Sequence, residues 1–219
     1  MSDTDTKKTI EKNKLYIGLF SLIIVLAILI IFIAKSCSNS GTNSGTDSSA
    51  SNNAVKSISV ISESGDQNET IKADIQVRDV KFSKKLKTVK KYESKQKDTD
   101  SNPSVAESND GYTYLTYKYN AENAPTFFGT KIIATDANAM LVYVFHNNKL
   151  IELRIQYGKV GADAYKSIVT NINTTYGNAT YSRTYSNGTE ESWWKTDKVT
   201  LDVICQDSGV IAYYRTNNN

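Results

Sequence analysis

The chain carries few side chains with catalytic chemistry. His146 is the single histidine among 219 residues, and the two cysteines are Cys37 and Cys205. General-base catalysis at His146 would need a nucleophile and an orienting acid, and the sequence places neither beside it. One histidine and two distant cysteines also fall short of the four ligands of a zinc site. The sequence therefore predicts no enzyme, no metal and no cofactor, with an overlooked hydrolase site as the weakest alternative.

Charge and motifs also argue against nucleotide and nucleic-acid binding. The chain lacks the glycine-rich loops that hold phosphates. Beyond Lys35 it carries 21 basic and 20 acidic residues. That balance lacks the basic excess of nucleic-acid-binding domains. We therefore expect no nucleic-acid partner.

Aromatic residues are the stronger candidates, for recognition rather than catalysis. Adjacent residues of a strand point to opposite faces of its sheet, so Trp193 and Trp194 should separate. One tryptophan is expected in the core, and the other exposed or under a neighbouring element. A binding platform for a protein or a glycan would combine aromatic rings on nearby strands, namely Trp193, Trp194, Tyr112, Tyr114, Tyr181 and Tyr185. The alternative is that both tryptophans only pack.

A second candidate surface is rich in lysine. Phe82, Leu86 and Val89 recur at helical spacing, which predicts a short amphipathic helix over 82–92 with Ser83 as its N-cap. Its outer face would carry the chain's densest group of cations, Lys84, Lys85, Lys87, Lys90 and Lys91. Such a face is either simply solvated or contacts an anionic wall polymer or lipid headgroups.

The N-terminal region predicts where in the cell the chain is located. Residues 15–34, from Leu15 to Ala34, are uncharged and almost wholly aliphatic, and this length spans a bilayer as a helix. Lysines are concentrated before this segment, so the positive-inside rule places residues 1–14 in the cytoplasm and the C-terminal domain outside the cell. The alternative is processing near Cys37, which would give a secreted or lipid-anchored form.

A polar spacer separates the predicted anchor from the predicted domain. Residues 35–54 are rich in serine, asparagine, glycine and threonine and cannot bury a core, so they predict a flexible linker. Residues 55–219 then form the extracytoplasmic domain. The whole chain contains 14 tyrosines and only two prolines, and this composition favours a sheet in the domain.

Alternating apolar residues predict most of the strands, and one segment predicts a second helix. The clearest helical stripe runs over Ala162–Tyr176, with Gly177 as the C-terminal cap. Residues 94–111 are polar and predict a loop. The predicted strands are Val55–Ile61, Ile71–Val77, Tyr112–Tyr119, Thr126–Thr135, Met140–His146, Leu150–Tyr157, Thr180–Tyr185, Glu191–Lys195, Val199–Cys205 and Val210–Arg215.

These elements predict an α+β fold, an antiparallel-sheet domain with two helices packed on one face. A helix followed by strands occurs twice, so the domain divides into possible halves over 71–158 and 161–216. This arrangement is a possible tandem helix-plus-meander repeat, in which the order of the elements repeats and the amino-acid sequence does not.

The same segments resemble a known kind of binding module. They are FSKKLKTVKKYE before YTYLTYKY, the pair MLVYVFHNNKLIELRIQY, and AYKSIVTNINTTYG before ESWWKTDKVTLDVI. The pattern is similar to the tandem helix-plus-sheet modules of the beta-lactamase inhibitory protein type and of small outer-membrane assembly lipoproteins. The resemblance covers about residues 71–215 and implies a binding or scaffold domain without catalysis.

The sequence thus predicts a non-enzymatic, single-pass membrane protein of the bacterial cell surface. It is held in the membrane by Leu15–Ala34, and its outer domain binds another protein. The alternative is a surface protein that binds cell-wall glycan or polymer through the aromatic strands and the lysine-rich helix.

Overall fold

A computed structural model describes residues 58–98, 102–119, 123–133 and 136–217. Its main element is a nine-stranded sheet in which every neighbouring pair is antiparallel. The strands follow the order β1 (Val60–Gly65), β8 (Tyr181–Tyr185), β9 (Glu190–Lys195), β10 (Val199–Gln206), β11 (Gly209–Thr216), β7 (Lys149–Gln156), β6 (Met140–His146), β3 (Tyr112–Tyr117) and β2 (Ser104–Glu107).

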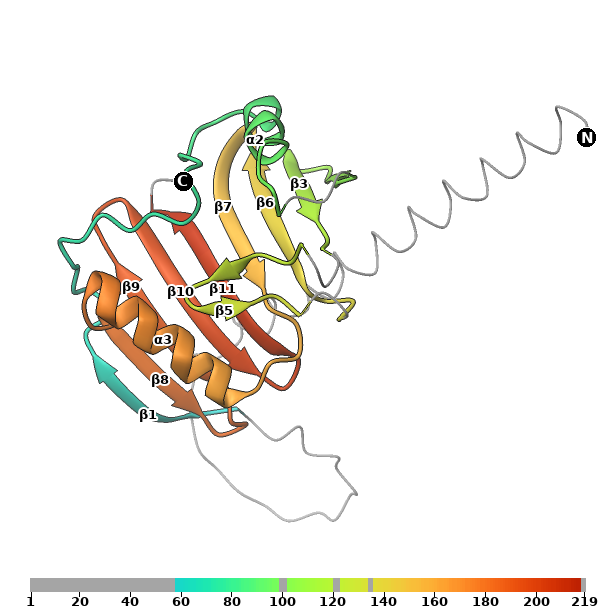
Figure 1. Cartoon of the computed structure of the whole chain (residues 1–219). Helices are drawn as coiled ribbons and strands as arrows, with labels where there is room; N and C mark the ends of the chain where they lie inside the picture. The colour runs from blue at the N-terminus through green and yellow to red at the C-terminus, as the bar shows by residue number, and fades with distance from the viewer. Residues whose placement is uncertain (1–57, 99–101, 120–122, 134–135, 218–219) are drawn as a thin grey trace, which may run out of the picture. The chain divides into compact units, whose positions relative to one another are not determined.

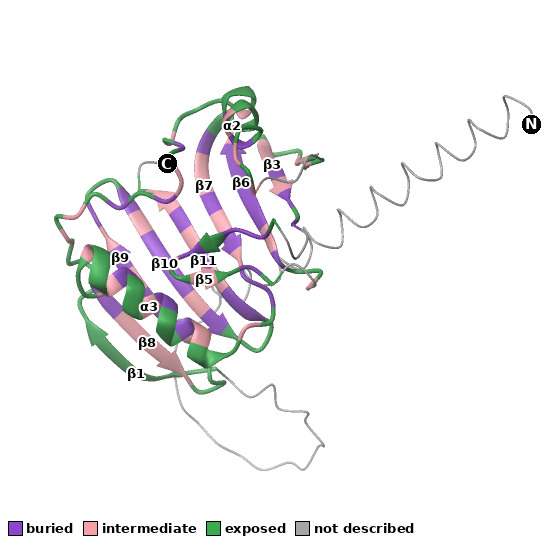
Figure 2. Ribbon diagram, in the orientation of Figure 1, coloured by how far each residue is buried: buried purple, intermediate pink, exposed green. Residues whose placement is uncertain are grey.

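Period-two alternation gives the sheet one apolar face, which we call the core face. Leu141, Tyr143 and Phe145 of β6 are fully buried, and the next strands continue the layer with Leu153 and Ile155. Alternate residues along a strand share a face, and most of the buried bands in Figure 2 belong to this layer. Strand β6 is an exception, because Val142 and Val144 on its opposite face are buried as well.

Helix α3 (Ala162–Tyr176) covers the core face over β8, β9 and β10 (Figure 1). Its stripe of Tyr165, Ile168 and Ile172 is buried, as its spacing predicts. Gly177 ends the helix with a φ of 97°, a conformation that favours glycine, and its N–H bonds the Asn173 carbonyl at 2.9 Å. The hairpin of β4 (Thr126–Phe127) and β5 (Thr130–Lys131) lies beside α3 on the same face.

Helix α2 (Leu86–Glu93) begins later than its sequence pattern predicts. Ser83 is not its N-cap: that position belongs to Lys85, and Ser83 has a φ of 66°. The reason is pairing with the sheet, because the Ser83 N–H bonds the Leu150 carbonyl and the Leu150 N–H bonds the Lys84 carbonyl. Val89 is the fully buried apolar residue of α2, within the same core.

A buried ion network fixes the end of α2. The Glu93 side chain is fully buried, and the Arg78 guanidinium bonds its two carboxylate oxygens at 3.1 and 2.8 Å. Arg78 also bonds both oxygens of Asp98 at 3.0 Å, and the Tyr143 hydroxyl donates to Glu93. Arg78 holds a left-handed backbone conformation, with a φ of 55°. The network joins the segment before α2, the end of α2 and strand β6.

Four predicted segments differ from the structure. In place of the strand predicted over Val55–Ile61, residues 58 and 59 form no strand and β1 runs over Val60–Gly65. Residues 71–77 form no strand, although Ile75 and Val77 are buried as their alternation indicates. The predicted strand over 126–135 turns back as β4 and β5, because Phe128 and Gly129 both have positive φ. The predicted loop over 94–111 contains edge strand β2.

The coarse prediction of an α+β fold is confirmed, with two helices and a mostly antiparallel sheet among the described residues.

The strands that follow each helix along the chain form one group of neighbours in the sheet. Strands β2, β3, β6 and β7 follow α2 as neighbours, and β8, β9, β10 and β11 follow α3 as neighbours. The two groups meet where β7 pairs with β11.

The predicted anchor at 15–34 and the predicted linker at 35–54 lie outside the described residues. Within the residues that the structure does describe, neither helix has the length and hydropathy needed to span a membrane.

Candidate functional site

The face of the sheet opposite the core face forms the candidate site, and we call it the open face. Its side chains alternate with those of the core layer and are mostly half-buried rather than fully buried. Strand pairing sets Arg154, Tyr213, Asp202, Trp193 and Tyr181 side by side in one row across the sheet. The row carries charged and aromatic groups in place of the small polar residues of an ordinary solvated face.

One group on the open face, the Trp193 cluster, consists of Tyr181, Arg183, Tyr185, Glu191 and Trp193. The Arg183 guanidinium carbon lies 4.8 Å from the Tyr185 ring centroid, 5.2 Å from that of Trp193 and 5.8 Å from that of Tyr181. Arg183 Nε donates to Glu191 at 2.6 Å, and the Tyr185 hydroxyl donates to the same oxygen at 3.0 Å. These contacts hold the rings and the cation in one arrangement before any partner binds.

Protonation of this cluster gives the first testable prediction. Burial is the largest single effect and disfavours the charged form of Glu191, but the hydrogen bond and charge of Arg183 together with the Tyr185 hydroxyl outweigh it, so the pKa of Glu191 is lowered from 4.5. The unfolded chain therefore takes up this proton first as the pH falls. The contribution of Glu191 to stability is present above about pH 4.5 and is lost as the pH falls through the lower folded-state pKa.

We expect the free energy of unfolding of Glu191→Gln to fall less than that of the wild type between pH 5 and 2. Urea unfolding at each pH measures this acid limb of the stability profile. Arg183→Met should also shrink or reverse this acid loss, because without the guanidinium the burial of Glu191 raises its folded-state pKa. Identical acid limbs in wild type and Glu191→Gln would contradict this assignment.

A second group, the Tyr213 cluster, consists of Tyr114, Glu152, Arg154, Asp202, Tyr213 and Arg215. The Arg154 guanidinium carbon lies 5.8 Å from the Tyr114 centroid and 5.7 Å from the Tyr213 centroid. Arg215 lies over the same Tyr213 ring, at 5.6 Å. Each arginine also has a carboxylate partner, Glu152 for Arg154 and Asp202 for Arg215. The two clusters therefore repeat one chemical arrangement.

The structure separates the predicted aromatic residues. Trp194 belongs to the core face and is fully buried, so its prediction as a binding residue is wrong, while the prediction that the two tryptophans part is confirmed. Tyr181 and Tyr185 do lie with Trp193. Tyr112 and Tyr114 share the open face but lie on β3, five strand spacings or about 24 Å from Trp193 on β9.

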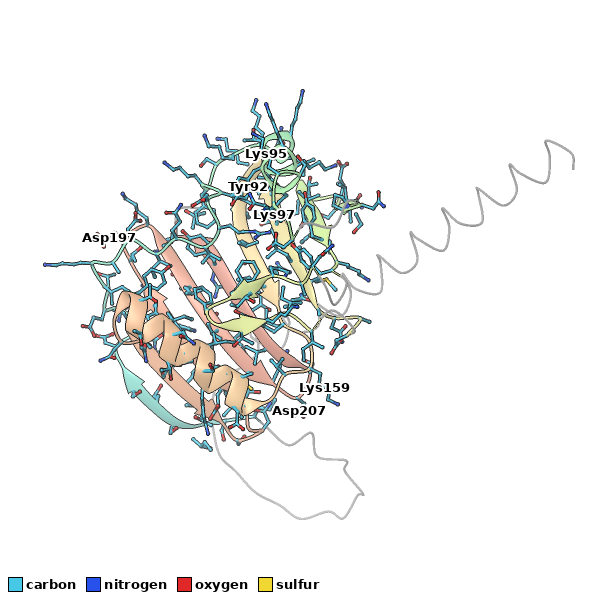
Figure 3. The ribbon with its side chains drawn as sticks, in the orientation of Figure 1. Tyr92, Lys95, Lys97, Lys159, Asp197 and Asp207 are labelled. Atoms are coloured by element: carbon cyan, nitrogen blue, oxygen red, sulfur yellow. The ribbon has the colours of Figure 1, made fainter. Side chains whose placement is uncertain are left out.

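The predicted lysines do not join these clusters. Lys84 and Lys85 precede α2, and Lys87 and Lys91 lie on it, all exposed. The buried residues of α2 face the core, so this lysine group is separate from the open face. Side chains at this end of the domain, such as Lys95 and Lys97, are labelled in Figure 3.

Sequence reasoning missed the charged half of the site. Arg154, Arg183, Arg215 and Tyr213 were not singled out. The signal was the alternation of Glu152 and Arg154 with buried residues in LIELRIQY, which marks one wet face.

Catalytic and metal-binding groups are sparse in the part of the chain that the structure describes. There, no group of three or more histidine, cysteine or acidic residues could hold a metal ion. Burial raises the pKa of the Cys205 thiol, which disfavours the reactive thiolate. His146 stacks on Tyr112 with ring centroids 4.7 Å apart.

Comparisons of the chain with protein families, with characterised proteins and with solved structures give no match.

Proposed function

We propose that this chain is a non-enzymatic, membrane-anchored protein whose extracytoplasmic domain binds another protein through the open face. The observation that carries the proposal is the pair of arginine–aromatic clusters on one face of the sheet. Tryptophan, tyrosine and arginine are the residues that contribute most binding energy in protein interfaces. The uncharged stretch at 15–34 supports the anchor, as argued from its length and flanking lysines.

Preorganisation is the physical reason for favouring binding here. The guanidinium carbon of Arg183 already lies within 6 Å of three rings and its charge is paired to Glu191. A partner would therefore meet side chains whose rotamer entropy is already reduced, which lowers the cost of association. Rings and paired charges together favour a protein surface that offers aromatic and hydrogen-bonding groups over a uniformly charged polymer.

Strand order supports the further proposal of a tandem helix-plus-meander repeat. Each helix precedes four strands that are neighbours in the sheet, and the two fourth strands, β7 and β11, pair with each other. Each half contributes strands to the open face. The Tyr213 cluster draws on both halves, through Arg154 of β7 and Tyr213 of β11.

The experiment is crosslinking and capture from intact cells that carry the full-length protein. We expect Trp193→Ala to reduce capture of a specific protein partner at least tenfold, because central interface tryptophans contribute about 2 kcal/mol or more. Trp193→Phe should retain part of the capture. Lys87→Ala, an exposed change on α2, is the matched control and should leave capture unchanged.

Two outcomes would reject this function. Capture that survives both Trp193→Ala and Tyr213→Ala, in variants whose melting curves stay cooperative, would exclude the open face. Recovery of cell-wall material that Lys87→Ala abolishes and salt weakens would favour the glycan alternative.

A further inference from the structure

A cavity lies on the core face at the edge of the sheet, on the other side of β8 and β9 from the side chains of the Trp193 cluster. It occupies about 340 Å³ between β1, β8 and β9, beside the first turn of α3. Strand pairing brings Ser62 next to Thr184 and Ser64 next to Ser182 on this face. Strand β1 is the edge strand and all of its residues are exposed, so the helix leaves this corner of the sheet accessible (Figure 1).

Every residue that lines the cavity has a polar or charged side chain. The cavity is lined by Ser62, Glu63, Ser64, Tyr165, Ser182, Arg183, Thr184, Glu190 and Glu191. Glu63, Arg183 and Glu191 alternate with the others and direct their ion pair and hydrogen bonds to the open face. The charged side chain that belongs to the core-face wall is therefore Glu190, which stands among hydroxyl groups.

A chain of hydroxyl groups forms one wall. The Tyr165 hydroxyl lies 2.8 Å from Ser192 Oγ, which lies 2.8 Å from Ser182 Oγ. Burial raises the pKa of Tyr165 to about 12, so its hydroxyl stays protonated at neutral pH. A ligand hydroxyl that meets Ser182 can accept or donate, because each hydroxyl in the chain can turn.

The carboxylate of Glu190 supplies the observation that points to a ligand. Its Oε2 atom is buried and has no hydrogen-bond partner in the described structure. An unpaired buried carboxylate oxygen is costly, and native proteins rarely leave one without a donor. The last torsion of a glutamate is broad, so a small rotation can turn this oxygen toward a donor in the cavity.

We propose that this cavity binds a small hydroxylated molecule that carries a protonated amine, the chemistry of an amino sugar. The ammonium group pairs with the Glu190 carboxylate, and the ligand hydroxyls bond Ser62, Ser64, Ser182 and Thr184. The Tyr165 ring provides the one aromatic surface in the lining. A volume of about 340 Å³ lies at the small end of the range for ligand pockets, about 300–1,000 Å³.

The test uses the full-length protein and saturation-transfer NMR with glucosamine as the probe. Glucose, which keeps the hydroxyls and lacks the amine, is the matched ligand. We expect glucosamine to bind, and glucose to bind at least tenfold more weakly. Glu190→Gln should weaken glucosamine at least tenfold and remove its preference over glucose, because the amide has no charge to pair with the ammonium.

A glutamate at the far edge of the sheet provides the control variant. Glu107→Gln makes the same chemical change at an exposed position of β2, the opposite edge strand, and should leave glucosamine binding unchanged. Ser182→Leu fills the cavity and should abolish binding of both sugars. Trp193→Ala should have no effect, so failure of the open-face function and failure of this site are distinguishable.

Three results would overturn the proposal. They are no saturation transfer to glucosamine with the wild-type protein, equal binding of glucosamine and glucose, and unchanged glucosamine binding in Glu190→Gln. Each variant needs a cooperative melting curve, which shows that the domain is still folded.

Discussion

Replacing Arg78 with methionine is expected to destabilise the protein by about 3–5 kcal/mol, the range for removing one partner of a buried ion pair. Methionine keeps most of the length of the side chain, so the loss reports mainly on the charge. Without Arg78 the fully buried Glu93 carboxylate still accepts from the Tyr143 hydroxyl but loses the positive charge and the two hydrogen bonds of the guanidinium. Urea unfolding followed by circular dichroism gives the free energy.

Two further variants separate charge from packing at this network. Arg78→Met combined with Glu93→Met removes both charges, and we expect it to recover part of the stability that the single change loses. Lys91→Met removes a cation from the exposed face of α2 and should stay within about 0.5 kcal/mol of wild type. A single Arg78→Met change that costs less than 1 kcal/mol would show that the network contributes little.

Truncating Trp194 is expected to cost about 3–5 kcal/mol, the range for removing a large aromatic side chain from a core. Its ring is fully buried between β9 and α3, and its Nε1–H bonds Asn173 Oδ1 at 3.1 Å and the Gly177 carbonyl at 3.0 Å. Trp194→Ala therefore opens a cavity and takes a donor from two acceptors at the end of α3, of which Asn173 Oδ1 keeps its bond from the Ala179 N–H.

The adjacent tryptophan is a matched control within the same strand. Trp193→Ala removes the same side chain from the open face, where it is only half-buried, and should cost less than half as much. The loss of stability in Trp194→Phe should lie between those of Trp194→Ala and Trp193→Ala, because phenylalanine keeps an aromatic ring but lacks the N–H donor. Circular dichroism melts are suitable, since both changes remove a fluorophore. Equal losses for the two alanine variants would contradict the assignment of faces.

Strong periodicity made several elements predictable from sequence. Strand β6 and helix α3 have the predicted bounds, Met140–His146 and Ala162–Tyr176, because β6 is an unbroken apolar run and α3 carries one uninterrupted helical stripe. Residues 71–77 show why periodicity can mislead. Their alternation buries Ile75 and Val77 from a non-strand segment, where the Ile75 carbonyl accepts a bond from the Tyr214 hydroxyl. Alternation indicates which residues are buried. A strand forms only where the segment also has a neighbouring strand to hydrogen-bond with.

Predicting the candidate sites requires the order of the strands in the sheet, and the sequence pattern does not reveal that order. Alternation predicted that Trp193 and Trp194 would part, and they do. It could not bring Arg154 beside Tyr213, because their strands are neighbours only after the two groups of strands meet. The lining of the Glu190 cavity likewise depends on β1 pairing with β8, far apart in the chain.

The pairing of β7 with β11 has a consequence for the order of folding. Most neighbouring strands within each group are joined by tight turns, the exception being β3 and β6, which the β4–β5 hairpin separates in the chain. Such tight hairpins form in about 1–10 μs. Strands β7 and β11 are separated by α3 and by the rest of the second group, so closing that long loop carries a larger entropic cost. We expect the two halves to form first and this seam to close late. The Tyr213 cluster would then assemble last, together with the complete native topology.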